Sequence, residues 1–226
     1  PRMSFFFGCH NDFFEEISKF RAARELWYEL VNERFNPQNP KSSQLRFHTQ
    51  TAGVTLTAQQ PMNNAVRVSY QALSAVLGGT QSLHTNSYDE AIGLPTDESV
   101  KIALRTQQII ASETGVADVV DPLAGSYHVE EMTASIKENA RMLINKIETK
   151  GGVLDCLKLG FQQKMIHESA WKEIKDIEEN SLLVVGVNCN IEEGDGLQLG
   201  MKIDSENEKR QKSKLGQFKQ KRDQEI

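Results

Sequence analysis

The sequence predicts an α/β fold in which a short parallel sheet is covered by amphipathic helices. Three strand-like runs begin near residues 4, 44 and 80, and a polar loop and a helical pattern follow each run. Strands that alternate with helices form right-handed crossover units and a parallel sheet. These strands carry more polar residues than buried parallel strands usually do. The sheet is therefore either a small open α/β domain or part of a larger barrel.

The first unit joins a strand at Ser4–Cys9 to a long helix near Asp12–Arg34. Asn36–Pro37 ends this unit, because the residue before a proline is disfavoured in helical geometry. The apolar residues of the helix recur at helical spacing and predict one buried face, made of Phe13, Ile17, Phe20, Trp27 and Val31.

The second unit joins a strand at Gln44–Thr49 to a helix that we expect to begin near Thr57. Gln60 follows Thr57 by three residues, which is the spacing of a capping box. Gly78–Gly79 supplies the end of the helix. The expected buried face consists of Val66, Tyr70, Leu73 and Leu77.

The third unit joins a strand at Thr80–Thr85 to a helix capped by Thr96 and followed by Gly115. Threonine is a favoured residue at the N-cap. The side chains expected to face inward are Val100, Ala103, Leu104 and Ala111.

After the third unit the pattern changes, so we divide the chain into residues 1–128, 129–203 and 204–226. The middle part is expected to hold helices near Val129–Lys150 and Val153–His167 and one short strand at Leu182–Val187. The last part has 12 charged residues among 23, seven basic and five acidic. Mixed charge of this kind predicts a solvated helix or a linker.

Composition is that of a soluble globular protein. The chain has 226 residues, 26 basic and 31 acidic side chains, a formal charge of −5 and 38% apolar residues. No apolar run approaches the ~20 residues that cross a bilayer, and a mildly acidic chain is a poor nucleic-acid binder. The cysteines Cys9, Cys156 and Cys189 are far apart and odd in number. They predict free thiols in a reducing cytoplasm rather than disulfides or a zinc site.

Polar side chains alternate along the second and third strands, so they should share one face of the sheet. A dry core cannot hold so many polar groups without partners, and we expect this face to line a wet or ligand-filled space. Ligands of α/β folds bind where the strands end and the loops begin. The residues are Arg46, His48, Gln50, Ser82, His84 and Asn86.

None of the short motifs that mark common catalytic or nucleotide-binding sites occurs in the chain. The five histidines do not form H-E-x-x-H, and G-x-G-x-x-G, phosphate-loop and G-x-S-x-G patterns are absent. Two polar, glycine-containing segments at strand ends remain, FHTQTAGVTLTAQQ and GGTQSLHTNSYDEAIGLPT. We interpret them as ligand-contact loops, with ordinary turns as the alternative.

At these segments the sequence resembles the large, catalytic subunit of methylmalonyl-CoA mutase and related adenosylcobalamin-dependent acyl-CoA mutases. The resemblance runs in unbroken order from Pro1 to Asn188, and two apolar residues, Val54 and Leu123, stand where many members carry tryptophan. These departures point to a divergent branch. The motifs are PRMSFFFG, FRAARELWYELV, RFHTQTAGVTLTAQQPMNN, GGTQSLHTNSYDEAIGLPT, DPLAGSYHVE and VVGVN.

The resemblance implies a TIM-type (β/α)8 barrel whose polar interior holds a CoA ester. This chain would supply the last three strand–helix units and the helical segment after them. The earlier units and the cobalamin-binding domain or subunit would be partners, since the D-x-H-x-x-G motif of the lower cobalt ligand does not occur here. No catalytic or metal-ligating residue is therefore assigned to this chain.

For the substrate, the resemblance implies CoA contacts at four positions. Arg2 suits a phosphate because its guanidinium forms bidentate, charge-assisted bonds, with a salt bridge at the barrel rim as the alternative. Ser4 and Ser82 match further CoA-contacting positions. Lys41 matches another, although a solvated lysine is also expected in its proline-rich loop.

For adenosylcobalamin, the resemblance implies contacts at the ends of the second and third strands. Glycine allows the close backbone approach that a flat macrocycle needs, and Glu90 can accept hydrogen bonds from corrin amides. The alternative for Glu90 is a charge at the start of the following turn, and His48 and His84 are expected to be ordinary structural residues. The implied contacts are Gln50, Gly53, Glu90, Ala91 and Gly93.

The sequence therefore predicts part of an acyl-CoA mutase, with rearrangement of methylmalonyl-CoA to succinyl-CoA as the first choice. Isobutyryl-CoA and 2-hydroxyisobutyryl-CoA are alternative substrates. A non-catalytic fragment or split subunit that docks to a partner is the alternative from another class, and an unrelated small α/β binding domain is a third. Bare sheet edges also predict a possible homodimer.

Overall fold

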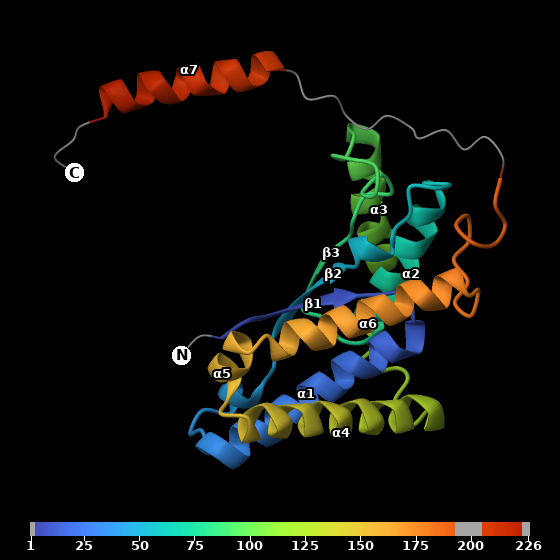
Figure 1. Ribbon diagram of the computed structural model, residues 1–226, viewed down its shortest axis with the longest axis vertical. Helices are drawn as coiled ribbons and strands as arrows, with labels where there is room; N and C mark the ends of the chain where they lie inside the picture. Colours follow the sequence, from blue (N-terminus) through green and yellow to red (C-terminus); the bar gives the residue numbers. More distant parts are fainter. Residues whose placement is uncertain (1–2, 193–204, 223–226) are drawn as a thin grey trace.

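A three-stranded parallel sheet with the strand order β1-β2-β3 lies at the centre of the molecule (Figure 1). The computed structural model describes residues 3–192 and 205–222. The strands are β1 (Phe5–Cys9), β2 (Phe47–Thr51) and β3 (Ser82–His84). The predicted parallel α/β arrangement is confirmed, although β2 begins three residues later than expected and extends to Thr51.

Helices connect the strands and continue after them. Helices α1 and α2 each link one strand to the next, and the later helices follow β3 (Figure 1). The bounds are α1 Phe13–Phe35, α2 Asn63–Leu77, α3 Asp97–Glu113, α4 Tyr127–Thr149, α5 Val153–Lys158, α6 Phe161–Glu178 and α7 Ser205–Lys221, with short 3-10 turns at Pro40–Ser43, Gly53–Thr55 and Val116–Asp118.

The hydrophobic core lies between α1, α2 and one face of the sheet. Phe20 of α1 is fully buried, and its ring stacks on Phe47 of β2 with centroids 5.2 Å apart. Phe7 of β1 meets the Phe47 ring edge-on at 5.3 Å. Burial of large aromatic side chains makes this cluster the main apolar contribution to the fold.

Helix α1 begins and ends as the sequence predicts. Asp12 is its N-cap, and the Asp12 carboxylate accepts a hydrogen bond from the Glu15 backbone N–H. Asn36 ends the helix in the left-handed conformation, which asparagine adopts more readily than most residues. These signals are local, so they can be recognised without knowledge of the tertiary contacts.

Helix α2 differs from the prediction in its start and in its buried face. It begins at Asn63 rather than near Thr57, because Gln60 has a left-handed φ of 46° and Pro61 follows it. Val66 and Tyr70 are exposed, whereas a stripe of smaller residues faces the sheet. Small side chains let the helix approach the strands closely. The prediction that the largest apolar residues form the buried face is therefore wrong for Val66 and Tyr70. The buried stripe is Asn64, Val68, Gln71, Ala72, Ser74 and Ala75.

Helix α3 has the predicted N-cap but a thinner buried face than expected. The Thr96 hydroxyl accepts a hydrogen bond from the Ser99 backbone N–H. Of the four side chains expected to face inward, only Ala103 is buried, and Val100 and Leu104 are exposed. The reason is that α3 packs against α2 and the turn at Val116–Asp118, while β3 is the outermost strand of the sheet in the described part of the chain.

The segment after α4 also departs from expectation in two places. The single helix expected at Val153–His167 is two helices, because Leu159 ends α5 and Gly160 has a left-handed φ of 69°. Leu182–Val187 is not a strand. Val185 forms one isolated bridge with Cys189, and an apolar run this short cannot form a ladder without a neighbouring strand. The charged last part contains the helix α7, one of the two predicted alternatives.

Charged side chains fasten α4 to α1. Arg21 of α1 is only 12% exposed, and its guanidinium donates to Asp121, to Glu130 and to the hydroxyl of Thr133. Farther along the two helices, Lys137 and Arg141 form ion pairs with an acidic row of α1, Glu25, Glu29 and Glu33. The contacts fix the helical segment to the outside of α1.

Replacing Arg21 with methionine should destabilise the protein by about 1–3 kcal/mol, because the carboxylates of Asp121 and Glu130 would lose the partly buried cation that pairs with them. This is less than for a fully buried pair, since Asp121 and Glu130 are partly exposed and solvent screens them. Arg34→Met is the matched control, because the Arg34–Glu148 pair is exposed on both sides and contributes ~0–1 kcal/mol. Urea unfolding measures both changes, and equal effects would contradict this account of Arg21.

The isolated 226-residue polypeptide should self-associate at micromolar concentration. In the described residues β1 and β3 each pair on one side only, and exposed strand edges pair with other chains. Phe6 of β1 is 64% exposed, so Phe6→Lys should shift sedimentation towards the monomer mass of 25.4 kDa. A wild-type monomer with protected β1 amides would show that the edges are not adhesive.

Candidate functional site

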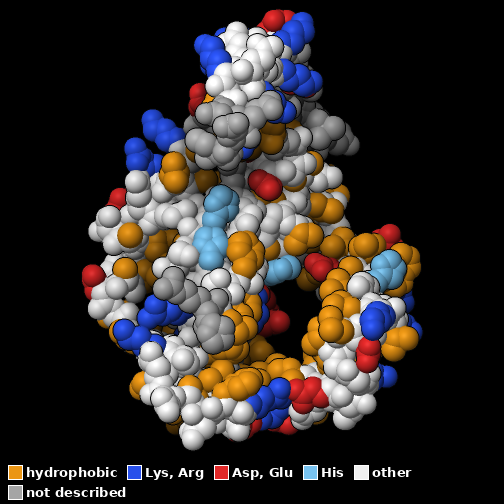
Figure 2. Space-filling model, turned by 90° about the vertical axis from the view of Figure 1, so that its left-hand side faces the viewer, with side chains coloured by type: hydrophobic (Ala, Val, Ile, Leu, Met, Phe, Trp, Pro, Cys, Tyr) orange, Lys and Arg blue, Asp and Glu red, His pale blue; other side chains and the backbone are white. Residues whose placement is uncertain are grey.

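The face of the sheet opposite α1 and α2 is open and largely polar. Strand register places side chains on it in rows, and Phe6, His48 and Ser82 form one row across β1, β2 and β3. Gly8, Gln50 and His84 form the next row. His48 and Gln50 are half-buried, whereas their neighbours in sequence on β2 point into the core. The predicted polar face is therefore present, and Figure 2 shows histidine side chains exposed together on the surface in view.

The carboxyl ends of β2 and β3 bring three predicted cofactor contacts together. The Gln50 amide Nε2 donates to Asn86 Oδ1 (3.0 Å), and the Asn86 backbone N–H donates to Thr51 Oγ1 (2.9 Å). A Cβ added to Gly53 would lie 2.8 Å from Asn86 Nδ2 and 3.3 Å from Glu90 Cγ. Gln50 therefore bonds Asn86, and Asn86 and Glu90 both lie beside Gly53, although 37 residues separate Gly53 from Glu90 in the chain.

Asn86 belongs to this group although the sequence did not predict it as a cofactor contact. Its side chain is buried, and its Nδ2 is a buried donor with no hydrogen-bond partner in the described part of the chain. An unmet donor beside a bare glycine suits a ligand that approaches the backbone closely and carries hydrogen-bond acceptors. The alternation of polar residues in the sequence placed Asn86 on this face but did not single it out.

The remaining predicted cofactor contacts lie on the turn after β3. Ala91 and Gly93 are exposed, and the Gly93 N–H donates to the Asp89 carbonyl (3.1 Å). Asp89 is buried and its carboxylate accepts from the Thr96 backbone N–H, which ties the turn to the start of α3. The turn is therefore held in place while its outer side stays open.

The three predicted CoA contacts that the structure describes lie at the starts of the strands, opposite the end that holds the predicted cofactor contacts. Ser4 precedes β1, and Lys41 lies in the 3-10 turn before β2; both are exposed. Ser82 begins β3 on the open face, where its Oγ is 2.7 Å from His48 Nδ1. Arg2 lies outside the described residues. The two predicted sets thus occupy opposite ends of a sheet whose strands all run the same way.

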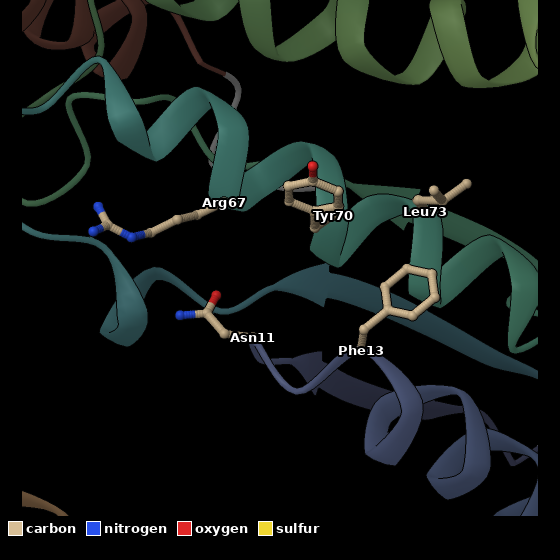
Figure 3. A pocket seen from close by; sticks show the side chains of 5 residues that line it. All are labelled: Asn11, Phe13, Arg67, Tyr70 and Leu73. Atoms are coloured by element: carbon tan, nitrogen blue, oxygen red, sulfur yellow. The ribbon is translucent and has the colours of Figure 1, made fainter. Parts of the chain in front are cut away.

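Two cavities differ in their relation to the predicted contacts: the first lies away from them, and the second includes one of them. One, of about 440 Å³, is lined by Asn11 of the loop before α1, the first residue of α1 and three residues of α2. The polar groups of Asn11 and Arg67 lie at one side and Phe13 and Leu73 at the other (Figure 3). It lies on the helical side and contains none of the predicted ligand residues. A second, of about 330 Å³, follows the outer edge of β3 and includes Ser82.

Among the described residues the titratable side chains form no metal-binding cluster, and burial keeps Cys9 protonated. Residues 3–192 and 205–222 contain no group of three or more His, Cys, Asp or Glu side chains that could hold a metal ion. Burial raises the pKa of the Cys9 thiol to about 12. Cys9 Sγ lies 3.1 Å from both the Gln71 carbonyl and Ser74 Oγ, so it is a core residue rather than a nucleophile.

Comparison with known proteins shows what family this arrangement comes from. The profile of the methylmalonyl-CoA mutase family matches residues 1–226. The chain belongs to the methylmalonyl-CoA mutase family. The predicted resemblance is therefore confirmed over the whole chain.

Three members of the family show how far the similarity extends. The 2-hydroxyisobutanoyl-CoA mutase large subunit of Aquincola tertiaricarbonis is 48% identical over 88% of this chain and 35% of its own length. Methylmalonyl-CoA mutase of Cereibacter sphaeroides is 50% identical over 83% of the chain and 26% of its own length. The mitochondrial methylmalonyl-CoA mutase of Homo sapiens is 45% identical over the full chain and 30% of its own length.

This chain thus spans about a quarter to a third of the length of these relatives. In the described ranges no helix combines the length and the apolar character that a membrane crossing requires.

In the native protein Cys9 should resist alkylation at pH 8, because a thiol with a pKa near 12 is almost fully protonated there and the thiolate is the reactive form. Cys189, which is partly exposed, is the internal comparison and should be labelled first. Mass spectrometry after iodoacetamide treatment distinguishes the two sites, and urea should make Cys9 reactive. Native labelling of Cys9 at the rate of Cys189 would contradict its burial.

Proposed function

We propose that this chain is part of an adenosylcobalamin-dependent acyl-CoA mutase and supplies contacts to both the CoA ester and the corrin ring. The observation that carries the proposal is the open polar face, with one set of predicted contacts before the strands and another after them. Membership of the family supports the same assignment.

The fold that we propose for the assembled protein is a (β/α)8 barrel in which β1, β2 and β3 are the last three strands. Two observations support it among the described residues: α1 and α2 pack on one face of the sheet while the polar side chains of the other face are exposed or half-buried, and both outer strands are unpaired on one side. In a closed barrel the open face becomes the interior and the edges pair. Residues 1–128 would form the barrel part, 129–203 the helical segment and 204–226 a charged tail.

The CoA ester would bind along the open face. Lys41 and Arg2 are cations that suit its phosphate groups, and the hydroxyls of Ser4 and Ser82 suit the amide and carbonyl groups of its extended arm. The residues would hold the substrate rather than react with it, and no catalytic role is proposed for this chain.

Adenosylcobalamin would lie against the carboxyl ends of β2 and β3. The residues present fit the group: Gly53 offers bare backbone, Asn86 an unmet donor, and Gln50 and Glu90 further hydrogen-bonding groups. Ala91 and Gly93 present a smooth, exposed turn. When bound, the cofactor supplies the radical chemistry, while these side chains orient it and exclude water; the lower cobalt ligand would come from a cobalamin-binding domain or subunit.

The reaction that we propose is the isomerisation of methylmalonyl-CoA to succinyl-CoA, in the reducing cytoplasm that three unpaired thiols suit. The 48% identity to a 2-hydroxyisobutanoyl-CoA mutase large subunit makes that branched substrate, or isobutyryl-CoA, the second candidate. A docking module without catalysis is the alternative from another class. Assays of the assembled protein with each acyl-CoA separate these possibilities, and the chain on its own should be inactive with all of them.

Gly53→Ala should weaken adenosylcobalamin binding in the assembled protein about tenfold or more, because a methyl group would overlap Asn86 Nδ2 and crowd Glu90. Gly8→Ala is the matched control, since a Cβ at Gly8 would meet nothing nearer than the His10 ring at 3.8 Å. Calorimetry or the visible spectrum of the cofactor gives the affinity. Equal affinities for the two variants would show that the corrin ring does not bind at this end of the sheet.

A further inference from the structure

His48 lies between two side chains of its own row on the open face, the row that joins Phe6, His48 and Ser82. It lies on the central strand, in register with Phe6 of β1 and Ser82 of β3. The Phe6 and His48 rings are 5.2 Å apart at a tilt of 42°, and His48 Nδ1 is 2.7 Å from Ser82 Oγ. The imidazole thus has an aromatic ring on one side and a hydroxyl on the other, and its position is fixed from both.

Ser82 needs such a partner if it is to make a directional contact. It is exposed and begins a strand of three residues at the edge of the sheet, and a serine hydroxyl turns freely unless a hydrogen bond holds it. A bond from the half-buried central strand fixes the Oγ atom in position. It also fixes polarity: when Nδ1 accepts the Ser82 O–H, the remaining lone pairs of Oγ face the open side as acceptors.

The next row along the sheet lacks this arrangement. Gln50 and His84 are paired in register, but the Gln50 amide donates to Asn86 instead. Gly8 takes the β1 position of that row and has no side chain to pack on Gln50 as Phe6 packs on His48. Of the two histidines on β2 and β3, only His48 therefore has both a ring contact and a serine partner.

We propose that His48 is a positioning residue for the substrate: it orients the Ser82 hydroxyl so that Oγ accepts a hydrogen bond from an amide N–H of the CoA arm. The inference rests on the proposed function, because it requires Ser82 to contact the acyl-CoA. It goes beyond it by giving a role to a histidine that the sequence placed among ordinary structural residues.

The test uses the assembled mutase and three substitutions. His48→Asn places an amide group where Nδ1 was, so it can still bond Ser82, whereas His48→Gln places the amide where Nε2 was and cannot. Ser82→Ala removes the hydroxyl itself. His128→Gln is the histidine control, because His128 contacts Phe14 on the helical side of the molecule. The readouts are the dissociation constant for the acyl-CoA without adenosylcobalamin, by calorimetry, and KM against kcat.

His48→Gln and Ser82→Ala should each weaken acyl-CoA binding about two- to tenfold, the size of one hydrogen bond, with the loss in KM and not in kcat. The double variant should lose no more than either single one, and His48→Asn should retain most of the affinity. Thermal unfolding of each variant separates lost folding from lost orientation.

Two results would overturn the inference, and they differ. If Ser82→Ala weakens binding but His48→Gln does not, or if the two losses multiply, His48 does not position Ser82 and the proposed function stands. If Ser82→Ala leaves the affinity unchanged, Ser82 does not contact the acyl-CoA, and that part of the proposed function fails with the inference.

Discussion

The period of two along the strands, combined with a fixed register, determines most of what this protein can do. Phe47, Thr49 and Thr51 point into the core, and His48 and Gln50 between them point to the open face. A slip of one residue between β1 and β2 would exchange the two sets and expose the Phe47 ring. The stacking of Phe20 on Phe47 fixes the register and, as a consequence, the rows of polar side chains on the other side. Core and site are therefore two faces of one constraint.

Helix α1 extends this constraint to the rest of the chain. Its inner side carries Phe20 and Ile17 into the core, and its outer side carries Arg21 and the acidic row that binds α4. Hydrogen bonds from Lys137 and Arg141 lower the pKa of Glu29. A depressed carboxyl pKa contributes stability above its unfolded value and loses it as the pH falls through the folded one. The attachment of α4 to α1 therefore weakens in acid, while the aromatic core does not titrate.

The sequence predicts those features that depend on local or periodic signals. Thr96 caps its helix as expected, the helix predicted near Asp12–Arg34 is α1, and the alternation on β2 and β3 places the polar face correctly. Prediction from the sequence fails where contacts between distant residues determine which side chains are buried or which strands form. The apolar size of Val66 and Tyr70 suggested a buried face, but the small residues of α2 face the sheet because the backbone approaches closely there. The run Leu182–Val187 has strand composition but no neighbouring strand to pair with.

The same distinction applies to the site. Gln50, Gly53 and Glu90 could be named by resemblance, but their grouping with Asn86 around Gly53 depends on two strands and a turn that meet only in the fold. Asn86 and His48 act through partners 36 and 34 residues away. Single-position reasoning cannot find such pairs, since neither residue has an unusual local sequence. Register can, because it states which residues of neighbouring strands face one another.

The parallel direction of the strands also limits which ligands can use both ends of the site. Ser4 and Lys41 precede β1 and β2, whereas Gln50 lies near the carboxyl end of β2, and Gly53 and Glu90 follow β2 and β3. A strand of five residues is about 16 Å long, so a molecule that reaches both sets must be extended and must lie along the strands. A compact metabolite would meet only one set. An acyl-CoA has a long flexible arm between its phosphates and its acyl group, so its acyl end would reach the carboxyl ends of the strands while its phosphates stay at the start. Under the proposed function, that polarity would place the reacting group beside Gly53 and Glu90, where a flat cofactor would have bare backbone to lie against.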